Sequence, residues 1–570
     1  MDHTEGLTRR GSSAFGWLLL AFLFFVSGLL HGCSTRKGDS RIALEIRHEV
    51  ARPFRWFKKA SVDDDDIQPL VRKFYLARRF QPAWTHDNGP TGDANELMKE
   101  LAEAPDYGLR SEDYDLQRLE TLKSESGVVL GGEGKPKTLA ALDIELTRNF
   151  LKYATHRSSG QINPKQLPAD WHVQPRKNDV VAALTAAIDG HRVHEALDSV
   201  DPEGRQYGEL RNALASLRQL EAKGGWPEVP PGGALKRGSS GPRVAALQQR
   251  LAASGDLGGG YAASRFDAAT EAGLRSFQER QGLEPDGVAN DDDFAQLNVP
   301  IGSRIRQIGL NLERWRWVPE SLFVGRYLEV NVPEYMMRVH EGGHTVLDMR
   351  VVVGKRFSPT PFFVDEISYL VINPFWNVPA SIATEEILLE LQKDPDYLAK
   401  NNMRLLSSPG EDASEVDPHS VNWNATSPED FTYAIRQDPG PYNPVGHVKF
   451  MCPNQFNVYL HDTPSDQLFA ASERSRSHGC IRLERPLDLA EYVLRGKPEW
   501  DRVGIEAAFD SSHNRSVTLP EPLPVRIMYW TAFVDDRGRL QFRDDVYGLD
   551  KMLDRALRAP RPGISTTVRT

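Results

Sequence analysis

The stretch SRSHGCIRLE, residues 475–484, is the most informative part of this 570-residue chain. It places Cys480 between a His-Gly pair and an Ile-Arg pair. A buried structural cysteine prefers apolar neighbours, so these polar neighbours favour a reactive thiol. Gly479 permits a tight turn, and we expect the N–H groups around Gly479 and Cys480 to face a developing oxyanion.

A histidine upstream is suited to activate this thiol. The stretch HVKFMCPNQFNVYLHD, residues 447–462, predicts a β-hairpin with its turn at residues 453–455, so that His461 closes a strand. A thiol attacks carbonyl groups only as the thiolate, and a nearby imidazolium favours that form. Arg482 lies two residues after Cys480 and shares its face of a strand, where it can hold a substrate carboxylate or carbonyl.

Other interpretations of Cys480 fit less well. A metal site made of His461, His478 and Cys480 would lack a fourth ligand at a familiar spacing. In papain-like proteases the cysteine precedes its histidine, whereas here the histidine comes first. A disulfide with Cys452 is disfavoured, because the hairpin register places Cys452 roughly 16 Å from His461. We therefore expect Cys452 to be a small core residue.

The amino terminus carries an export signal. Arg9 and Arg10 precede a mostly apolar run over residues 14–30, the order of a positive region and an apolar region. Cys33 follows at the position of the lipidated cysteine of a bacterial lipoprotein. An uncleaved inner-membrane anchor, a lipoprotein and a cleaved signal all stay open, and each of them places the rest of the chain outside the cytoplasm, in the periplasm.

Composition limits the class of protein. The chain is 40% hydrophobic and 26% charged, which is typical of folded soluble proteins, and its length predicts three or four domains. The formal net charge of −10 argues against a nucleic-acid partner, which would normally meet a basic face. Small-molecule, protein and polysaccharide partners remain possible.

The pattern along the chain predicts a multidomain α+β protein with a mostly antiparallel β domain. Apolar residues recur at three- and four-residue intervals in the first half, whereas β-branched and aromatic residues alternate after Arg306. The predicted segments are a signal or anchor over residues 1–33, a polar linker over 34–66, a helical scaffold over 67–230, a three-helix module over 235–299, a β domain over 306–511 with a long lid at about 379–445, and a β-hairpin extension with a tail over 512–570.

Two motifs point to a known family. The pattern H-x(15)-S-H-G-C-I-R resembles the signature of the L,D-transpeptidases, cell-wall cysteine enzymes with a YkuD-type catalytic domain. The stretches VVVGK, residues 351–355, and INPFWNVPASI, residues 372–382, agree with it. Residues 235–299 resemble a peptidoglycan-binding module, with a structural spacer as the alternative. The order of domains resembles the large Gram-negative subgroup.

The resemblance implies a two-step acyl transfer. Cys480 would attack the carbonyl of the third residue of a peptidoglycan tetrapeptide stem, releasing the terminal D-alanine and leaving a thioester. His461 would act as general base and acid, oriented by a backbone carbonyl just after it, that of Asp462. No cofactor and no metal is expected.

The same resemblance assigns further residues to the substrate. Those expected to position the substrate or to shape the oxyanion loop are Ser477, His478, Gly479 and Arg482. Weaker candidates for the wall of the groove, each also explicable as an ordinary packed residue, are Asn373, Trp376 and Tyr459.

The acceptor defines the biological role. The amine of a second stem gives a cross-link between third residues, a lipoprotein lysine gives anchoring, and water gives a carboxypeptidase. The separate module and long lid favour the cross-linking enzyme, and carbapenems are expected as covalent inhibitors. Rivals from outside the family are a sortase-like enzyme, whose arginine lies well beyond the cysteine, and a non-catalytic wall-binding protein.

Overall fold

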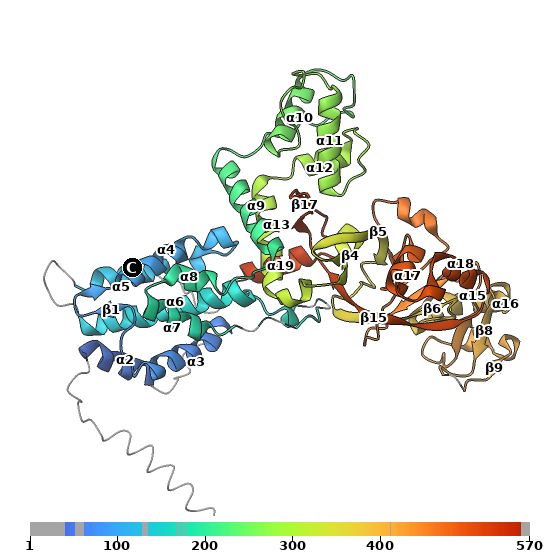
Figure 1. Ribbon diagram of the computed structural model, residues 1–570, viewed down its shortest axis with the longest axis horizontal. Helices are drawn as coiled ribbons and strands as arrows, with labels where there is room; N and C mark the ends of the chain where they lie inside the picture. The colour runs from blue at the N-terminus through green and yellow to red at the C-terminus, as the bar shows by residue number, and fades with distance from the viewer. Residues whose placement is uncertain are drawn as a thin grey trace, which may run out of the picture.

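The molecule is elongated, with a helical scaffold at one end, a β domain at the other and a three-helix module above their junction (Figure 1). Cys33 and the apolar run over residues 14–30 lie outside the part of the chain that the structure describes. No helix in the described part is both long and apolar enough to cross a membrane. The computed structural model describes residues 40–51, 62–127, 135–167, 169, 171–174, 176, 178–410 and 412–559.

The scaffold is helical, as the periodicity predicts, and packs around the long helix α6. Buried Asp143 on α6 accepts hydrogen bonds from the backbone of Ala83 and Trp84 and from the hydroxyls of Tyr75 and Thr85. The helices are α2 Arg41–Ala51, α3 Val62–Ala77, α4 Gly92–Ala102, α5 Leu116–Glu125, α6 Pro136–Ser159, α7 Val180–Gly190, α8 Val193–Asp198 and α9 Arg205–Ala222, with the short strands β1 Thr85–His86 and β2 Gly89–Pro90.

The expectation of a polar linker over residues 34–66 is wrong for Arg41–Ala51. These residues form α2, which buries Ile42, Ala43 and Ile46 in the scaffold core. Their spacing puts three apolar side chains on one helical face, and the charged residues around them hide this face in the average composition. A truncated protein for experiments therefore has to begin before Arg41.

The three-helix module forms at the expected position. Its helices are α10 Pro242–Ala253, α11 Ala268–Gln281 and α12 Asp291–Leu297, and the next helix, α13 Ile301–Arg316, packs against α9. The apolar face of α10 is buried, with Val244, Leu247 and Leu251 in the core of the module.

The β domain is built on one nine-stranded sheet in the order β13-β5-β14-β12-β11-β6-β15-β3-β4, and β4 also pairs with β5, so the sheet closes on itself. Most neighbours are antiparallel, but β12–β14, β13–β5 and β15–β3 are parallel. The strands are β3 Tyr327–Asn331, β4 Met336–Glu341, β5 His344–Gly354, β6 Val364–Ile372, β11 Val448–Met451, β12 Leu460–His461, β13 Ser475–Ser477, β14 Ile481–Leu483 and β15 Arg515–Met528, and the helices that follow β14 are α17 Pro486–Leu494 and α18 Arg502–Asp510.

The predicted boundary at residue 511 is wrong, because Arg515–Met528 is strand β15 in the middle of this sheet. Prolines interrupt its alternation, and the register shifts between Thr518 and Leu523, so the sequence looks like an extension. The predicted hairpin beyond it is confirmed as β16 Ala532–Val534 and β17 Leu540–Phe542. Helix α19, Leu549–Arg558, follows.

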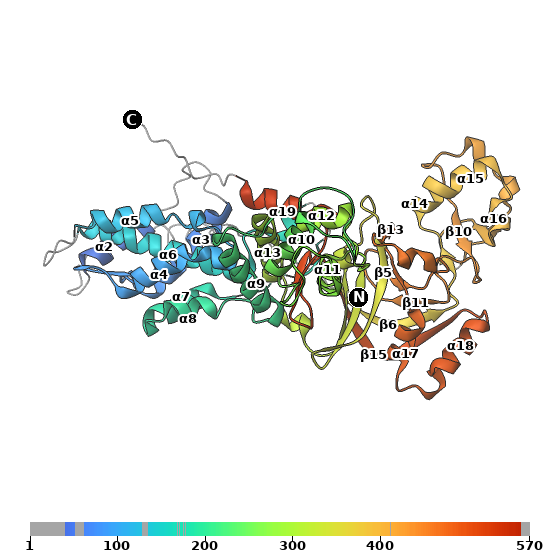
Figure 2. The ribbon, with the colours of Figure 1, turned by 90° about the horizontal axis from the view of Figure 1, so that it is seen from above.

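The predicted lid is a small folded unit with its own core, in which Ile387, Leu391 and Trp423 are buried. It lies on one side of the central sheet, and α18 lies on the other (Figure 2). Its four-stranded sheet has the order β7-β10-β8-β9. Its elements are β7 Trp376–Asn377, α14 Ala380–Ile382, the π-helix η6 Ala383–Ile387, α15 Leu388–Lys393, α16 Tyr397–Lys400, β8 Met403–Leu406, β9 Glu415–Val416 and β10 Ala434–Gln437.

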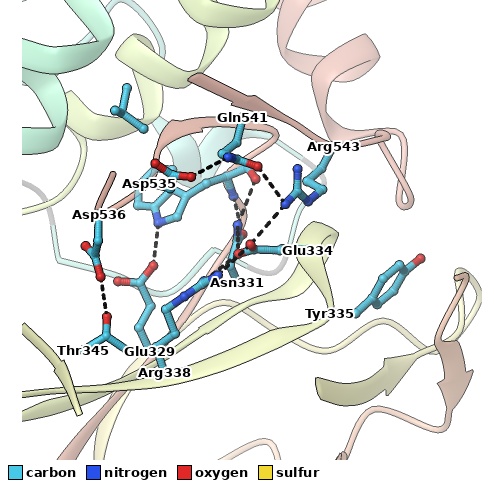
Figure 3. Close-up of polar contacts among 12 residues, drawn as sticks. Glu329, Asn331, Glu334, Tyr335, Arg338, Thr345, Asp535, Asp536, Gln541 and Arg543 are labelled. Atoms are coloured by element: carbon cyan, nitrogen blue, oxygen red, sulfur yellow. Dashed lines mark hydrogen bonds and ion pairs between the residues drawn. The ribbon is translucent and has the colours of Figure 1, made fainter. Parts of the chain in front are cut away.

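A buried polar network joins the β domain to the segment around the C-terminal hairpin (Figure 3). Glu334 accepts two hydrogen bonds of 2.7 Å from Arg338 and one of 3.2 Å from Arg543, beyond β17. Asn331 donates to the backbone carbonyl of Trp530. The bonds from Arg543 and to Trp530 join the C-terminal segment to β3 and the turn after it, so the network fixes how the hairpin sits on the sheet.

Glu329, next to this network on β3, makes stability depend on pH. It accepts a 3.2 Å hydrogen bond from the indole of Trp530, and burial raises its pKa to about 7. The unfolded carboxyl titrates at its ordinary pKa of about 4.5. The contribution of Glu329 to the free energy of unfolding is therefore fully present below pH ~4.5. It is lost, by about 3 kcal/mol, as the pH rises through ~7.

We expect Glu329→Gln to remove this loss. Urea unfolding at pH 5 and pH 8 measures it: the variant is more stable than the parent at pH 8 and loses less stability between the two pH values. Glu366→Gln, at an exposed site on β6, is the control. A pH dependence identical in parent and Glu329→Gln protein would show that Glu329 does not titrate as described.

Candidate active site

Strand pairing brings the predicted site residues together. In the parallel pair β12–β14, His461 lies opposite Arg482, and in the antiparallel pair β11–β12, Lys449 lies opposite His461. Because side chains alternate along a strand, Tyr459 and Cys480 share this face of the sheet. The ammonium of Lys449 lies 3.6 Å from the centre of the Tyr459 ring, and the Tyr459 and His461 rings are 5.5 Å apart.

His461 is held as a neutral base. Its Nδ1 lies 2.5 Å from the backbone carbonyl of Asp462, and since a carbonyl only accepts, Nδ1 carries the proton and Nε2 is left with the lone pair. Burial lowers the pKa of His461 to about 3, helped by the positive charges of Arg482 and Lys449. The geometry agrees with the Asp462 carbonyl as the orienting group.

Cys480 is also neutral at rest. Burial raises the pKa of its thiol, and hydrogen bonds from Tyr459 and the charges of Lys449 and Arg482 only partly oppose this. Its Sγ lies 3.8 Å from the carbonyl oxygen of Asn457. Burial thus disfavours both the imidazolium and the thiolate in the resting protein, so that proton transfer accompanies the attack.

This pair of neutral groups predicts a flat pH profile. We expect the second-order rate of thiol acylation by a carbapenem to change little between pH ~5 and ~8, because His461 becomes protonated only near pH 3 and the thiol ionises above its ordinary pKa. Time courses of adduct formation by mass spectrometry measure the rate. A fall in rate with a midpoint near pH 6.5 would contradict the buried, neutral His461.

The loop before Cys480 is shaped by Ser477. The hydroxyl of Ser477 donates to the carbonyl of Cys480 at 2.5 Å and accepts the N–H of Gly479 at 3.1 Å. The prediction that the Gly479 N–H faces an oxyanion is therefore wrong, because this donor is already used. Gly479 has a φ of +116°, which only glycine adopts readily, so its role is conformational. The backbone N–H of Cys480 has no hydrogen-bond partner among the described residues and is therefore available to donate to an oxyanion.

Thr360 supports this loop, a role that no sequence pattern assigned to it. Its buried hydroxyl accepts the N–H of Gly354 at 2.9 Å and donates to the carbonyl of Gly479 at 2.8 Å. A single hydroxyl thus joins the end of β5 to the turn that carries the nucleophile. The motif VVVGK and the Thr360-Pro361 pair that follows it mark this segment in the sequence. Only the fold shows that the hydroxyl of Thr360 contacts the turn at Gly479.

Replacing this hydroxyl should harm both stability and reactivity. In Thr360→Val the shape is kept, but a buried N–H and a buried carbonyl lose their partner, which costs about 2–4 kcal/mol. We expect urea unfolding to show this loss and carbapenem acylation to slow. Thr384→Val is the control, since Thr384 only bonds within its own lid helix. Unchanged stability and rate in Thr360→Val would contradict the role given to Thr360.

His478 links the loop to the lid. Its Nε2 lies 2.9 Å from the ammonium of Lys355, which follows β5, and 3.0 Å from the carboxylate of Glu386 on the π-helix η6. The exposed His478 is therefore a contact between the cysteine loop and the lid, and its predicted role in shaping the loop remains a prediction.

The other predicted residues differ in how well their surroundings suit a substrate-binding role. Arg482 is suited to an anionic ligand, since its buried Nε has no partner among the described residues. Trp376 is partly exposed in the lid sheet, opposite Gln437. Asn373 does not fit the groove: it is buried, and its amide donates to the carbonyls of Ala508 and Phe509 at the end of α18.

Lys449 was also missed, although the pattern contains a signal for it. In the stretch HVKFM the apolar residues Val448 and Phe450 face the core, so Lys449 has to face the other side, as His461 does. Cys452 is buried and free, as expected. Among the described residues no group of three or more His, Cys, Asp or Glu side chains could hold a metal ion.

Comparison with known proteins adds independent information. The profile described as L,D-transpeptidase catalytic domain matches residues 325–503, that of a scaffold domain matches residues 69–214, and that described as "putative peptidoglycan binding domain" matches residues 240–297. A Haemophilus influenzae protein described as "putative L,D-transpeptidase" is 30% identical over 523 residues, which cover 92% of this chain and 84% of the relative.

Solved structures of similar proteins include an L,D-transpeptidase from Xylanimonas cellulosilytica, with 16% identity over 53% of this chain and 100% of that chain and a TM-score of 0.17. Another is the LD transpeptidase LdtMt1 in complex with imipenem, with 13% identity over 36% of this chain and 59% of that chain and a TM-score of 0.16. At these scores the solved structures add nothing to the assignment.

Proposed function

This chain belongs to the L,D-transpeptidase family, and from that premise we propose that it cross-links peptidoglycan between the third residues of two stem peptides. The observation that carries the proposal is the shared sheet face of Cys480, Tyr459, His461 and Arg482, in which the carbonyl of Asp462 holds the Nδ1 proton of His461 and leaves Nε2 as the basic nitrogen. This arrangement supports acyl transfer through the thiol.

The proposed first step forms a thioester. His461 Nε2 takes the thiol proton as the sulfur of Cys480 attacks the carbonyl carbon of the third residue of a tetrapeptide stem. The N–H of Cys480 and the hydroxyl of Tyr459 are the donors available to the oxyanion. The bond to D-alanine then breaks, and the proton held on His461 passes to the departing amine.

The proposed second step releases the product. The amine of a second stem attacks the thioester and gives its proton to His461. The carbon–sulfur bond breaks, and that proton returns to the sulfur of Cys480, so the enzyme is restored. The unpaired guanidinium of Arg482 is placed to hold a carboxylate of a stem.

An amine acceptor is favoured over water by the architecture. The lid and the three-helix module provide surfaces beyond the cysteine site on which a second polymeric chain can lie. A carboxypeptidase or a lipoprotein-to-peptidoglycan transferase is the alternative within the same chemistry. The apolar run over residues 14–30 supports a place in the periplasm, with the chain anchored to a membrane by that run or by lipidated Cys33.

The proposal is tested by intact-protein mass spectrometry of the full chain in mild detergent. With a carbapenem, we expect a thioester adduct of the whole drug mass, because opening the β-lactam expels no fragment. With a disaccharide-tetrapeptide we expect a cross-linked dimer and free D-alanine. An adduct with only a tripeptide product would indicate a carboxypeptidase, and neither adduct nor product would leave a wall-binding protein.

A further inference from the structure

A cleft of about 730 Å³ lies far from the cysteine site, where the scaffold, the three-helix module and the C-terminal hairpin meet. Helices α9, α10, α11 and α13 and strand β17 surround this junction (Figure 1). No residue of the cysteine site lines the cleft. Its walls therefore belong to three separate parts of the fold, each of which contributes charged side chains.

Arg250, on α10, is a buried cation with no carboxylate in direct contact among the described residues. The residue is 2% exposed, its Nε donates to the carbonyl of Leu297, and its guanidinium lies 3.9 Å from the ring centre of Trp226. Its Nη1 is buried without a hydrogen-bond partner, and no carboxylate of the described residues lies within 4 Å of its nitrogens. Burial lowers the pKa of Arg250 to about 9, and the charge of Asp256 opposes this only in part.

Arg304, on α13, is a second cation of the same kind. It is 6% exposed, and its guanidinium donates to the amide oxygens of Gln281, Gln296 and Gln307, which carry no charge. It lies 4.5 Å from the centre of the Phe542 ring. Burial lowers its pKa to about 10.

The acidic side chains that line the cleft are already paired. Asp256 binds Arg280 through both of its oxygens, and Glu209 lies 3.7 Å from Arg205 on the same helix through one oxygen, while its other oxygen is buried without a hydrogen-bond partner. Arg280 is thus neutralised, whereas Arg250 and Arg304 are not. Because an uncompensated buried charge is costly, the cleft favours any anion that can reach both guanidinium groups.

From this arrangement we propose that the cleft binds a peptide carrying free carboxylates and small side chains, through Arg250 and Arg304. Guanidinium groups bind carboxylates through paired hydrogen bonds. The remaining walls supply small apolar and neutral polar contacts, from Ala213, Leu217 and Leu540 and from Asn212, Ser254 and Ser276. This ligand class includes the peptidoglycan stem, so the choice of ligand rests on the proposed function, whereas the anion site itself does not.

The site would hold wall material away from the point of reaction. A stem bound at the cleft engages the scaffold, the module and the C-terminal hairpin together, so it would keep the polymer attached while a neighbouring stem is transferred at Cys480. This increases the effective concentration of stems at the cysteine site without any added contact there.

The test uses the full chain in mild detergent, with Cys480→Ala so that no turnover occurs. Calorimetric titration with a soluble disaccharide-tetrapeptide gives the affinity, and hydrogen exchange of residues 250–256 locates the site. We expect the affinity of the site that protects residues 250–256 to fall by roughly tenfold or more in Arg250→Gln and in Arg304→Gln. Arg237→Gln removes one charge from an exposed position of the same module and is the matched control.

Three further arms make the outcome decisive. A tetrapeptide whose carboxylates are amidated should not protect residues 250–256. Inorganic phosphate should not displace the peptide; if it does so fully, the site takes phosphate-type anions and the peptide assignment is overturned. Circular dichroism checks that the variants fold. Because the two arginines come from different helices, a variant that fails to fold leaves the other variant as the test.

These experiments distinguish the absence of a peptide site in the cleft from the absence of acyl transfer at Cys480. Protection confined to residues 475–484, with none at 250–256, would overturn the inference and leave the cysteine site standing. Protection at 250–256 in a protein whose intact Cys480 is never acylated by a carbapenem would support the inference and contradict the proposed function.

Discussion

Cys480→Ala is expected to abolish acyl transfer, with a loss of roughly 10⁴-fold or more in the rate, because no other side chain of the site can form the thioester. Mass spectrometry should find no carbapenem adduct and no released D-alanine. The side chain is only partly buried, and its contacts are a 3.8 Å approach to the carbonyl of Asn457 and hydrogen bonds from Tyr459. We therefore expect the free energy of unfolding to change by less than about 1 kcal/mol.

Cys452→Ser provides the matched control for this experiment. Cys452 is 2% exposed, and its sulfur lies 3.5 Å from the carbonyl of Val458, a partner that a serine hydroxyl can keep. The variant should lose at most about 2 kcal/mol of stability and retain its turnover. Turnover that survives in Cys480→Ala, or disappears in Cys452→Ser, would mean that the nucleophile has been assigned to the wrong cysteine.

His461→Ala is expected to slow acylation by roughly 10²- to 10⁴-fold, the usual contribution of a general base. The neutral thiol of Cys480 then has no base to take its proton, and the loss should be smaller above pH ~9, where solvent hydroxide begins to ionise the thiol. Rates of carbapenem acylation at pH 7 and pH 9.5 measure both effects. A rate equal to that of the parent at pH 7 would remove His461 from the mechanism.

His447→Gln is the control for the histidine. His447 immediately precedes β11, exposed and stacked on Phe509 at a ring distance of 5.3 Å. Its replacement should leave the acylation rate within about twofold, since surface changes of this kind have small effects. A large loss in His447→Gln would indicate that the variants disturb the sheet rather than the chemistry.

Much of the fold was predictable because the signals are local. Apolar residues at helical spacing predicted the scaffold and the module, and alternation predicted the hairpin that ends at His461. Two segments were misjudged. Prolines hid the central strand Arg515–Met528, and charged neighbours hid the packed helix Arg41–Ala51. Both errors concern segments whose partner lies far away in the chain, which local pattern does not specify.

The sequence by itself determined the family of this protein. The spacing of His461, Cys480 and Arg482 and the turn-forming Gly479 carry the resemblance to the L,D-transpeptidases, because these residues form one short motif that can be recognised without knowing how distant segments pair. Only the tertiary structure decided how the groups act. It directs the Gly479 N–H to Ser477, buries His461 beside Cys480, which lowers the pKa of that histidine, and brings Thr360 to the loop.

The cleft at Arg250 and Arg304 belongs entirely to the tertiary structure. These two residues are 54 positions apart by their numbers and look like ordinary surface charges in amphipathic helices. Packing of the scaffold, the module and the hairpin removes water from both guanidinium groups without supplying carboxylates. Burial and pairing depend on contacts between distant segments, so a sequence pattern read along the chain cannot reveal them.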